Sequence, residues 1–194
     1  MVGGVGLTDD ELRDQAAAIA DARDELDADL TILHGVETNI DAEGDLSTDD
    51  DLLAELDVVV ASPHAALGQD RGPATDRLVR AVEHPSVDVL GHPTGRLIAE
   101  REGLSPDIER VAAAAADAGT ALEINADPAR LDLRGEFVRV AVDAGATVAV
   151  DTDAHAPGAL EYLRYGVHTA RRGWCEPGDL LNTRPTERLR SFLH

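Results

Sequence analysis

The feature that most constrains the fold is a repeated alternation of short apolar segments with longer amphipathic ones. The apolar segments are rich in Val, Ile and Leu and read as buried strands, expected at 30–40, 57–62, 87–92, 120–125 and 147–155. Around them, apolar residues at helical spacing predict helices at 9–26, 48–55, 74–83, 105–117, 135–144, 157–163, 167–173 and 185–193. Thr8 followed by Glu11 forms a capping box at the first helix. Strands alternating with helices in this way predict parallel βαβ units and an α/β fold.

Length and composition indicate a single globular domain over residues 1–194. Hydrophobic residues make up 43% of the 194 residues, which is enough for a sizeable core. No apolar run approaches the ~18 residues of a membrane span, and no signal peptide is recognisable at the start. One cysteine, Cys175, excludes an internal disulfide and is typical of a reducing cytosol, so we expect a cytoplasmic protein.

The charge is strongly negative. There are 38 acidic residues against 17 basic ones, all of them arginine, and the net charge is −21. Such a surface repels phosphate polyanions in dilute buffer, which argues against a classical DNA-binding surface. Acidic surfaces of this kind keep proteins soluble in concentrated salt, where charges are screened within ~3 Å at molar strength. We therefore interpret the composition as halophilic adaptation.

Histidines and carboxylates occur at or just after the expected strand ends. They are Glu37, His64, His92, Asp153 and His155. The carboxyl ends of parallel barrel strands converge on one mouth, so we expect these side chains to lie close together. Imidazole and carboxylate ligands suit zinc, manganese or iron, and such a site would lower the pKa of a bound water toward ~7. No G-x-G-x-x-G or Walker A motif follows a strand, which disfavours nucleotide-binding folds.

Other polar residues allow more than one interpretation. Arg96 could reach the mouth and pair with a phosphate oxygen, or it could form a surface ion pair. Asn125 could donate to a substrate or turn the chain after its strand. The remaining histidines are expected to be ordinary residues: His34, on the opposite strand face from Glu37, His84 at a helix end, His168 and His194. Cys175 lacks the surroundings of a nucleophile.

Several contiguous motifs resemble one known family. GVETNI, ASPHAAL, LGHPTGRLI, LEINADPARLDL and DTDAH look like the PHP (polymerase and histidinol phosphatase) domain. The tail YGVHTARRGWCEPGDLLNT is similar to the PHP domain at the C-terminus of bacterial and archaeal X-family DNA polymerases. The resemblance implies a distorted (β/α)7 TIM-like barrel with up to three divalent metal ions, zinc or manganese, at the strand ends.

The resemblance also assigns roles to residues. Glu37 matches the bridging glutamate, and His64 and His92 match its partners on one metal. Asp153 matches a ligand of a second metal and His155 a ligand of a third, and both are candidate catalytic residues together with Arg96. The implied activity is hydrolysis of phosphoesters, at DNA 3′ ends or in small phosphomonoesters. Polymerase activity is not expected of this chain.

The chain departs from the family at its front. The family begins with a strand ending in His-x-His and a second strand ending near an Asp-His pair, and nothing before Leu7 supplies either. We therefore expect an N-terminally truncated barrel that lacks about two βα units and whose open edge favours self-association. The first metal would keep its protein ligands, whereas the other two would lose most of theirs. Two alternatives stay open, namely a catalytically inactive metal-binding fragment and a stand-alone histidinol-phosphatase-like enzyme.

Overall fold

A computed structural model describes residues 6–26 and 29–193, so the expectation for His194 lies outside the described residues. The strands are β1 (Gly35–Asn39), β2 (Val58–Ser62), β3 (Val89–Leu90), β4 (Ala121–Asn125) and β5 (Val148–Asp151). The α-helices are α1 (Asp9–Glu25), α2 (Asp50–Leu53), α3 (Arg71–Val82), α4 (Ile108–Ala118), α5 (Gly135–Asp143), α6 (Leu163–Arg172) and α7 (Thr186–Arg190). Short 3-10 helices are η1 (Pro157–Tyr162), η2 (Pro177–Asp179) and η3 (Leu181–Thr183). None of the described helices has the length and apolarity needed to cross a membrane.

The predicted alternation of strands and helices is confirmed, and the first strand differs most in its bounds. It begins at Gly35, so the prediction of a strand over residues 30–34 is wrong. Side chains take the backbone groups that a neighbouring strand would have paired: Arg23 donates to the Ile32 carbonyl, and the His34 N–H donates to Asp57. His34 therefore precedes the strand rather than sharing it with Glu37. The capping box of Thr8 and Glu11 is present at α1 as predicted.

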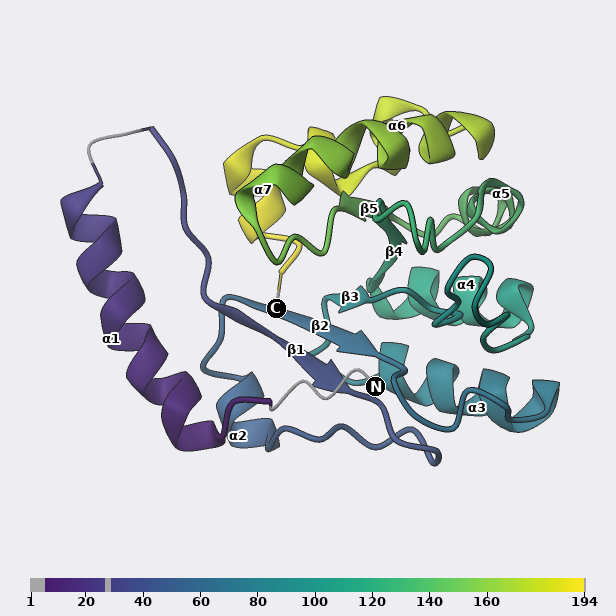
Figure 1. Cartoon of the computed structure of the whole chain (residues 1–194), viewed down its shortest axis with the longest axis horizontal. Coiled ribbons are helices and arrows are strands. Elements are labelled where there is room, and N and C mark those ends of the chain that lie inside the picture. The colour runs from purple at the N-terminus through teal and green to yellow at the C-terminus, as the bar shows by residue number, and fades with distance from the viewer. Residues whose placement is uncertain (1–5, 27–28, 194) are drawn as a thin grey trace.

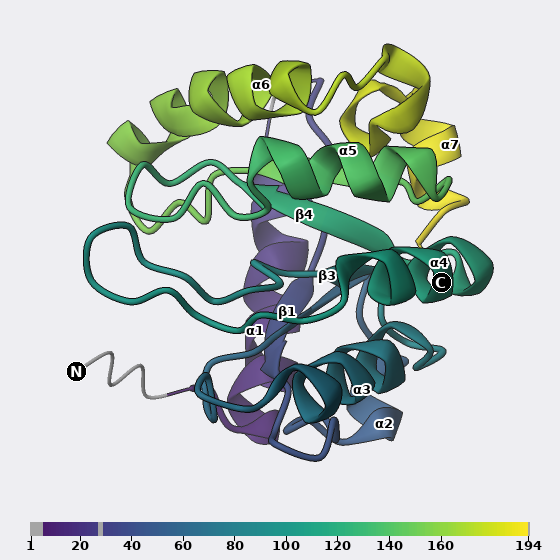
Figure 2. The same ribbon diagram turned by 90° about the vertical axis from the view of Figure 1, so that its right-hand side faces the viewer.

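The sheet is parallel throughout and its strand order follows the sequence, β1-β2-β3-β4-β5. Each crossover therefore turns in the same sense, and helices α3 to α6 lie side by side over one face of the sheet (Figures 1 and 2). α1 stands apart from this row (Figure 1). Sequential parallel order of this kind is consistent with a TIM-like arrangement. Among the described residues no pairing joins β1 to β5. The interpretation as a (β/α)7 barrel that lacks about two βα units stays a prediction.

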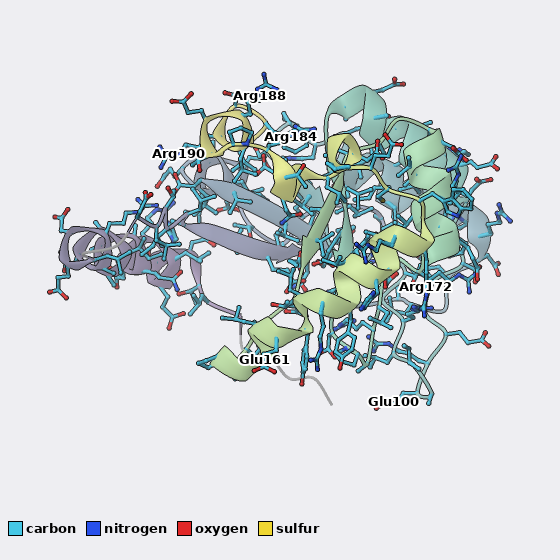
Figure 3. The ribbon with its side chains drawn as sticks, turned by 90° about the horizontal axis from the view of Figure 1, so that it is seen from above. Glu100, Glu161, Arg172, Arg184, Arg188 and Arg190 are labelled. Carbon is cyan, nitrogen blue, oxygen red and sulfur yellow. The ribbon has the colours of Figure 1, made fainter. Side chains whose placement is uncertain are left out.

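Two apolar clusters pack on the two faces of the sheet. The larger one lies between the strands and the helices and includes Val59, Leu122 and Ile124. The smaller one lies on the inner face, where Val89 and Ala149 pack with Leu181 and other residues of the C-terminal segment. In the view from above, Arg184, Arg188 and Arg190 of this segment lie at the opposite edge of the molecule from Glu100 and Glu161, which follow β3 and β5 (Figure 3). The C-terminal segment thus covers the inner face away from the carboxyl ends of the strands.

The outer side of β5 is paired by a side chain. The Asn182 amide accepts a hydrogen bond from the Val150 N–H (2.7 Å) and donates one to the Val150 carbonyl (2.9 Å). Two residues earlier, Leu180 forms a parallel bridge with Val148. The segment 180–182 therefore satisfies backbone groups of β5 that a further strand would otherwise pair.

Candidate metal centre

Glu37, His64 and His92 converge at the carboxyl end of the sheet. Glu37 projects from β1, while His64 and His92 follow β2 and β3. One potential ligand atom from each lies within 4.8 Å of the others. The Glu37 Oε1 atom is 3.0 Å from the Nε2 of His92 and 3.7 Å from the Nε2 of His64, and the two rings meet edge to face at 4.9 Å. The structure thus brings together the three residues that the sequence assigned to one metal.

The donor set fits a divalent metal ion. Both ring nitrogens of His92 are buried and lack a partner with hydrogen-bond geometry among the described residues. Although Nε2 approaches Glu37, a buried imidazole that makes no hydrogen bond is costly unless something else binds it. His64 is fixed from its other side, since its Nδ1 lies 2.6 Å from the Asn39 Oδ1, which leaves Nε2 facing Glu37. Holding the second ring nitrogen in this way is how proteins orient histidine ligands toward zinc and similar metals.

The electrostatics favour the protonation states that bind metals. Burial alone would raise the pKa of Glu37, but the approach of His92 and Ser62 and the charges of both histidines outweigh it and lower this pKa to about 2. Burial lowers the pKa of His64, assisted by the charges of His92 and Arg130, while Glu37 and Asp153 oppose the shift. At neutral pH the site therefore presents a carboxylate beside a neutral imidazole, the forms that act as ligands.

The turn that carries His92 requires its glycine neighbour. A Cβ atom at Gly91 would lie 2.2 Å from the Ser62 hydroxyl oxygen, so a larger residue could not follow β3 here. His92 and Asp153 adopt positive φ values of 20° and 47°, which are uncommon outside glycine. The surrounding structure holds them in place: the His92 N–H donates to the buried Glu123 carboxyl group, and the Asp153 N–H to Asp151. Backbone strain at a candidate site is typical of functional residues.

Three carboxyl groups beneath the site, two of them buried and one half-buried, were not predicted. Glu123 is the inner-face residue of β4, and burial together with the neighbouring Asp151 charge raises its pKa well above the usual value. Burial raises the pKa of Asp151 as well. Asp132 is fully buried and accepts hydrogen bonds from the Thr94 N–H and hydroxyl, yet burial still raises its pKa. An acidic residue within the apolar strand segment TALEIN was the available signal for Glu123.

Asp153 and His155 both follow β5 but differ in how far their side chains are exposed to solvent. Asp153 is largely buried, accepts a hydrogen bond from Asn125 (3.3 Å) and faces Arg130, whose Nε is 3.9 Å from its Oδ2. His155 has a side chain that is 86% exposed, and its Nδ1 lies 2.7 Å from the Asp153 carbonyl oxygen and 3.5 Å from the Asp153 Oδ1. Neither belongs to the three-residue cluster, and their assignments as ligands and catalytic residues stay predictions. Asn125 also accepts from the Asp127 N–H, so it both holds Asp153 and turns the chain.

The Arg96 guanidinium donates hydrogen bonds to backbone carbonyl groups of the protein. Its Nε donates to the Arg130 carbonyl (2.8 Å) and its Nη2 to the Leu131 carbonyl. It also lines a surface pocket of about 970 Å³ formed with Ile98, Arg101 and Phe137, which includes none of the metal-site residues. A direct contact from Arg96 to substrate phosphate therefore remains a prediction.

His84, His168 and Cys175 do not belong to the cluster. His84 follows α3 and pairs with Asp50 (3.2 Å), and His168 is exposed on α6. Burial and the Asp179 charge raise the pKa of Cys175 to about 11, the reverse of what a nucleophilic thiol needs.

The chain is similar to proteins of two descriptions. It is 43% identical over 188 residues to the DNA polymerase/3′-5′ exonuclease PolX of Bacillus subtilis (strain 168), a match that covers 97% of this chain and 33% of that protein. A probable phosphatase of Shewanella sp. (strain ANA-3) is 33% identical over 138 residues, covering 66% of this chain and 52% of the relative. A probable phosphatase of Shewanella sediminis (strain HAW-EB3) is 30% identical over 171 residues, covering 84% and 67%.

These alignments span from a third to two thirds of the relatives' own lengths. No protein-family model matches the chain. The last of the three matches nevertheless extends over two thirds of that relative's length, and it includes most of this chain. The chain therefore belongs to the family of these probable phosphatases.

Proposed function

We propose that this chain is a PHP-type, metal-dependent phosphoesterase domain related to the exonuclease and phosphatase domain of X-family DNA polymerases. The observation that carries the proposal is the cluster of Glu37, His64 and His92 at the carboxyl end of a parallel sheet. The names of the relatives agree with hydrolysis of phosphoesters, one as a 3′-5′ exonuclease and the others as probable phosphatases.

The residues of the site divide the work of such a reaction. Glu37, His64 and His92 would hold a divalent ion, zinc or manganese. When bound, such an ion would supply the Lewis acidity that activates phosphoryl oxygens and water in reactions of this class. Asp153, fixed by Asn125 and facing the same mouth, would accept a proton from the attacking water. His155, exposed beside it, would donate or accept protons at the leaving group or bind a further ion.

The substrate classes are DNA 3′ ends and small phosphomonoesters. The match along nearly the whole chain to a protein named as a 3′-5′ exonuclease favours DNA ends and a role in DNA repair. The net charge of −21 opposes DNA binding in dilute buffer, so we expect activity on DNA to need the high salt of a halophilic cytoplasm.

The test is metal content followed by hydrolysis. The chain, stripped by a chelator and refilled with zinc or manganese, should retain one ion, and Glu37→Gln should retain none. Glu109→Gln on α4, an exposed carboxylate away from the site, is the matched control and should leave metal content unchanged. Hydrolysis of p-nitrophenyl phosphate and of 3′-recessed DNA in high salt then assigns the substrate. A refilled wild-type chain that binds no ion would refute the metal site.

The alternative is a metal-binding domain without activity. The exposure of His155 and its separation from the cluster favour it, since the described residues then form only one site with three ligands. An ion bound in full amount with no hydrolysis of either substrate would support this alternative over the phosphoesterase.

A further inference from the structure

Arg130 lies at the candidate metal centre, and its guanidinium has a hydrogen-bond donor that the protein does not use. It follows β4, its side chain is only 13% exposed, and its Nε is 3.9 Å from the Asp153 Oδ2, too far for a hydrogen bond. Its Nη1 is buried and has no hydrogen-bond partner among the described residues. Its charge is close enough to His64 to lower the pKa of that imidazole. A cation thus borders the site with an unused buried donor.

The loop around Arg130 is held by other groups. Arg96 donates to the carbonyls of Arg130 and Leu131, and Leu131 takes a positive φ of 46°. The Arg130 N–H donates to the Asp127 carbonyl, and the Ala129 carbonyl accepts from the Ile98 N–H. The Arg130 guanidinium takes part in none of these bonds. Hydrogen bonds of other groups therefore hold this loop in its conformation. The donors of the Arg130 guanidinium are not needed to stabilise it.

The missing partner of these donors must be an acceptor. An unsatisfied buried donor costs free energy, and more so when it is charged. Asp153 supplies one negative charge at a distance, but a divalent ion held by Glu37 and the histidines would repel the guanidinium unless an anion lay between them. A phosphoryl group matches this place, because its oxygens accept two parallel bonds from a guanidinium fork.

We propose that Arg130 is the residue that binds the phosphoryl group of the substrate, and that Arg96 is a positioning residue which holds Arg130 in place through its backbone. This inference rests on the proposed phosphoesterase function and names the residue that contacts the substrate. Arg130 would contact the substrate phosphoryl group directly, whereas Arg96 would act on it only through the backbone of Arg130.

Binding of inorganic phosphate to the metal-refilled chain tests the contact without relying on turnover. Titration calorimetry should give a dissociation constant that rises about 10- to 100-fold in Arg130→Ala and less in Arg130→Lys, because a lysine keeps the charge but loses the fork. Metal content should not change. Arg110→Ala, which removes an exposed arginine paired with Asp76 on the helix face, is the matched control and should bind phosphate like wild type.

Arg96 is distinguished from Arg130 by chemical rescue. Added guanidinium ion should restore phosphate binding to Arg130→Ala, where it can fill the vacated place, and should not restore Arg96→Ala, where the loop itself has lost its clamp. Arg96→Lys, which can still donate to one carbonyl, should recover part of the affinity.

The outcomes separate this inference from the proposed function. Unchanged phosphate affinity in Arg130→Ala, or no phosphate binding by the metal-refilled wild type, overturns the role of Arg130. Hydrolysis by the wild type together with Arg130-independent binding overturns this inference alone. Arg130-dependent phosphate binding without hydrolysis of p-nitrophenyl phosphate or 3′-recessed DNA overturns the phosphoesterase and leaves Arg130 as a phosphate-binding residue of a metal-binding domain.

Discussion

Arg77 offers a sharp test of how the His64 loop is held. This residue of α3 is 1% exposed. Its Nη1 donates to the Ala65 carbonyl and to the Gln69 Oε1, both at 3.0 Å, and its Nη2 donates to the buried Ile40 carbonyl at 2.6 Å. One guanidinium thereby ties the end of β1 to the loop between β2 and α3 that carries His64.

Replacing Arg77 with Met keeps most of the apolar volume and removes the three bonds. The Ile40 carbonyl loses its partner in a buried place, at about 1–3 kcal/mol, and the two half-buried acceptors lose about 1 kcal/mol each. The variant no longer buries a charged group, which offsets part of the cost of the lost hydrogen bonds. We therefore expect a loss of about 3 kcal/mol in the free energy of unfolding. For a domain of this size that corresponds to a melting temperature lower by roughly 6–12 °C.

Thermal and urea unfolding followed by circular dichroism measure the change. Arg80→Met is the matched control, because Arg80 lies one turn along the same helix but is exposed and pairs with Asp45 at the surface. Its cost should stay below about 1 kcal/mol. Arg77→Met should also weaken metal binding, since Ala65 is adjacent to His64. Equal stabilities for the two variants would refute the reasoning.

Three further outcomes follow from individual side chains. Because burial raises the pKa of Asp132, the folded state holds this proton more tightly than the unfolded chain does. The free energy of unfolding should therefore fall as the pH rises from the unfolded pKa of ~4 toward the folded pKa, by up to about 1.4 kcal/mol per pH unit. Asp132→Asn should remove that loss, and parallel stability profiles for the two proteins would contradict it. Asn182→Ala should lower the free energy of unfolding by about 2 kcal/mol through its two bonds to Val150, whereas a cost below about 0.5 kcal/mol would mean that water replaces the amide freely. With a pKa of about 11, Cys175 should react with iodoacetamide at pH 8 at least ~10 times more slowly in the folded protein than in urea, and equal rates would disprove this.

Local periodicity predicted the order of the elements, and the rule that parallel strand ends share one edge predicted that the five candidate ligands lie together. The structure clusters three of them, Glu37, His64 and His92, a grouping that the resemblance to the PHP domain implied. Local periodicity failed where long-range side-chain bonds replace backbone pairing. Residues 30–34 have strand-like composition, yet Arg23 and Asp57 occupy the backbone groups that a strand would use.

The interior of the site was the harder part to predict. Glu123 and Asp132 are placed by the tertiary fold, and nothing in their local sequence says that their partners are the His92 and Thr94 backbones. Arg96 and Arg130 show the same limit. Both arginines lie in loops after strands, and only the structure shows that one fastens the loop of the other.

The amide of Asn182 has a consequence for how this sheet meets other chains. A carboxamide carries the same donor and acceptor as a peptide group, so the Asn182 side chain completes the hydrogen-bond ladder at Val150. Unlike a strand, a side chain does not continue along β5 beyond that residue. An extended segment from another molecule would have to displace that amide before it could add to β5. The Asn182 amide and the Leu180 bridge thus stop growth of the sheet at this side, and a second copy that associates with this domain should do so elsewhere on its surface.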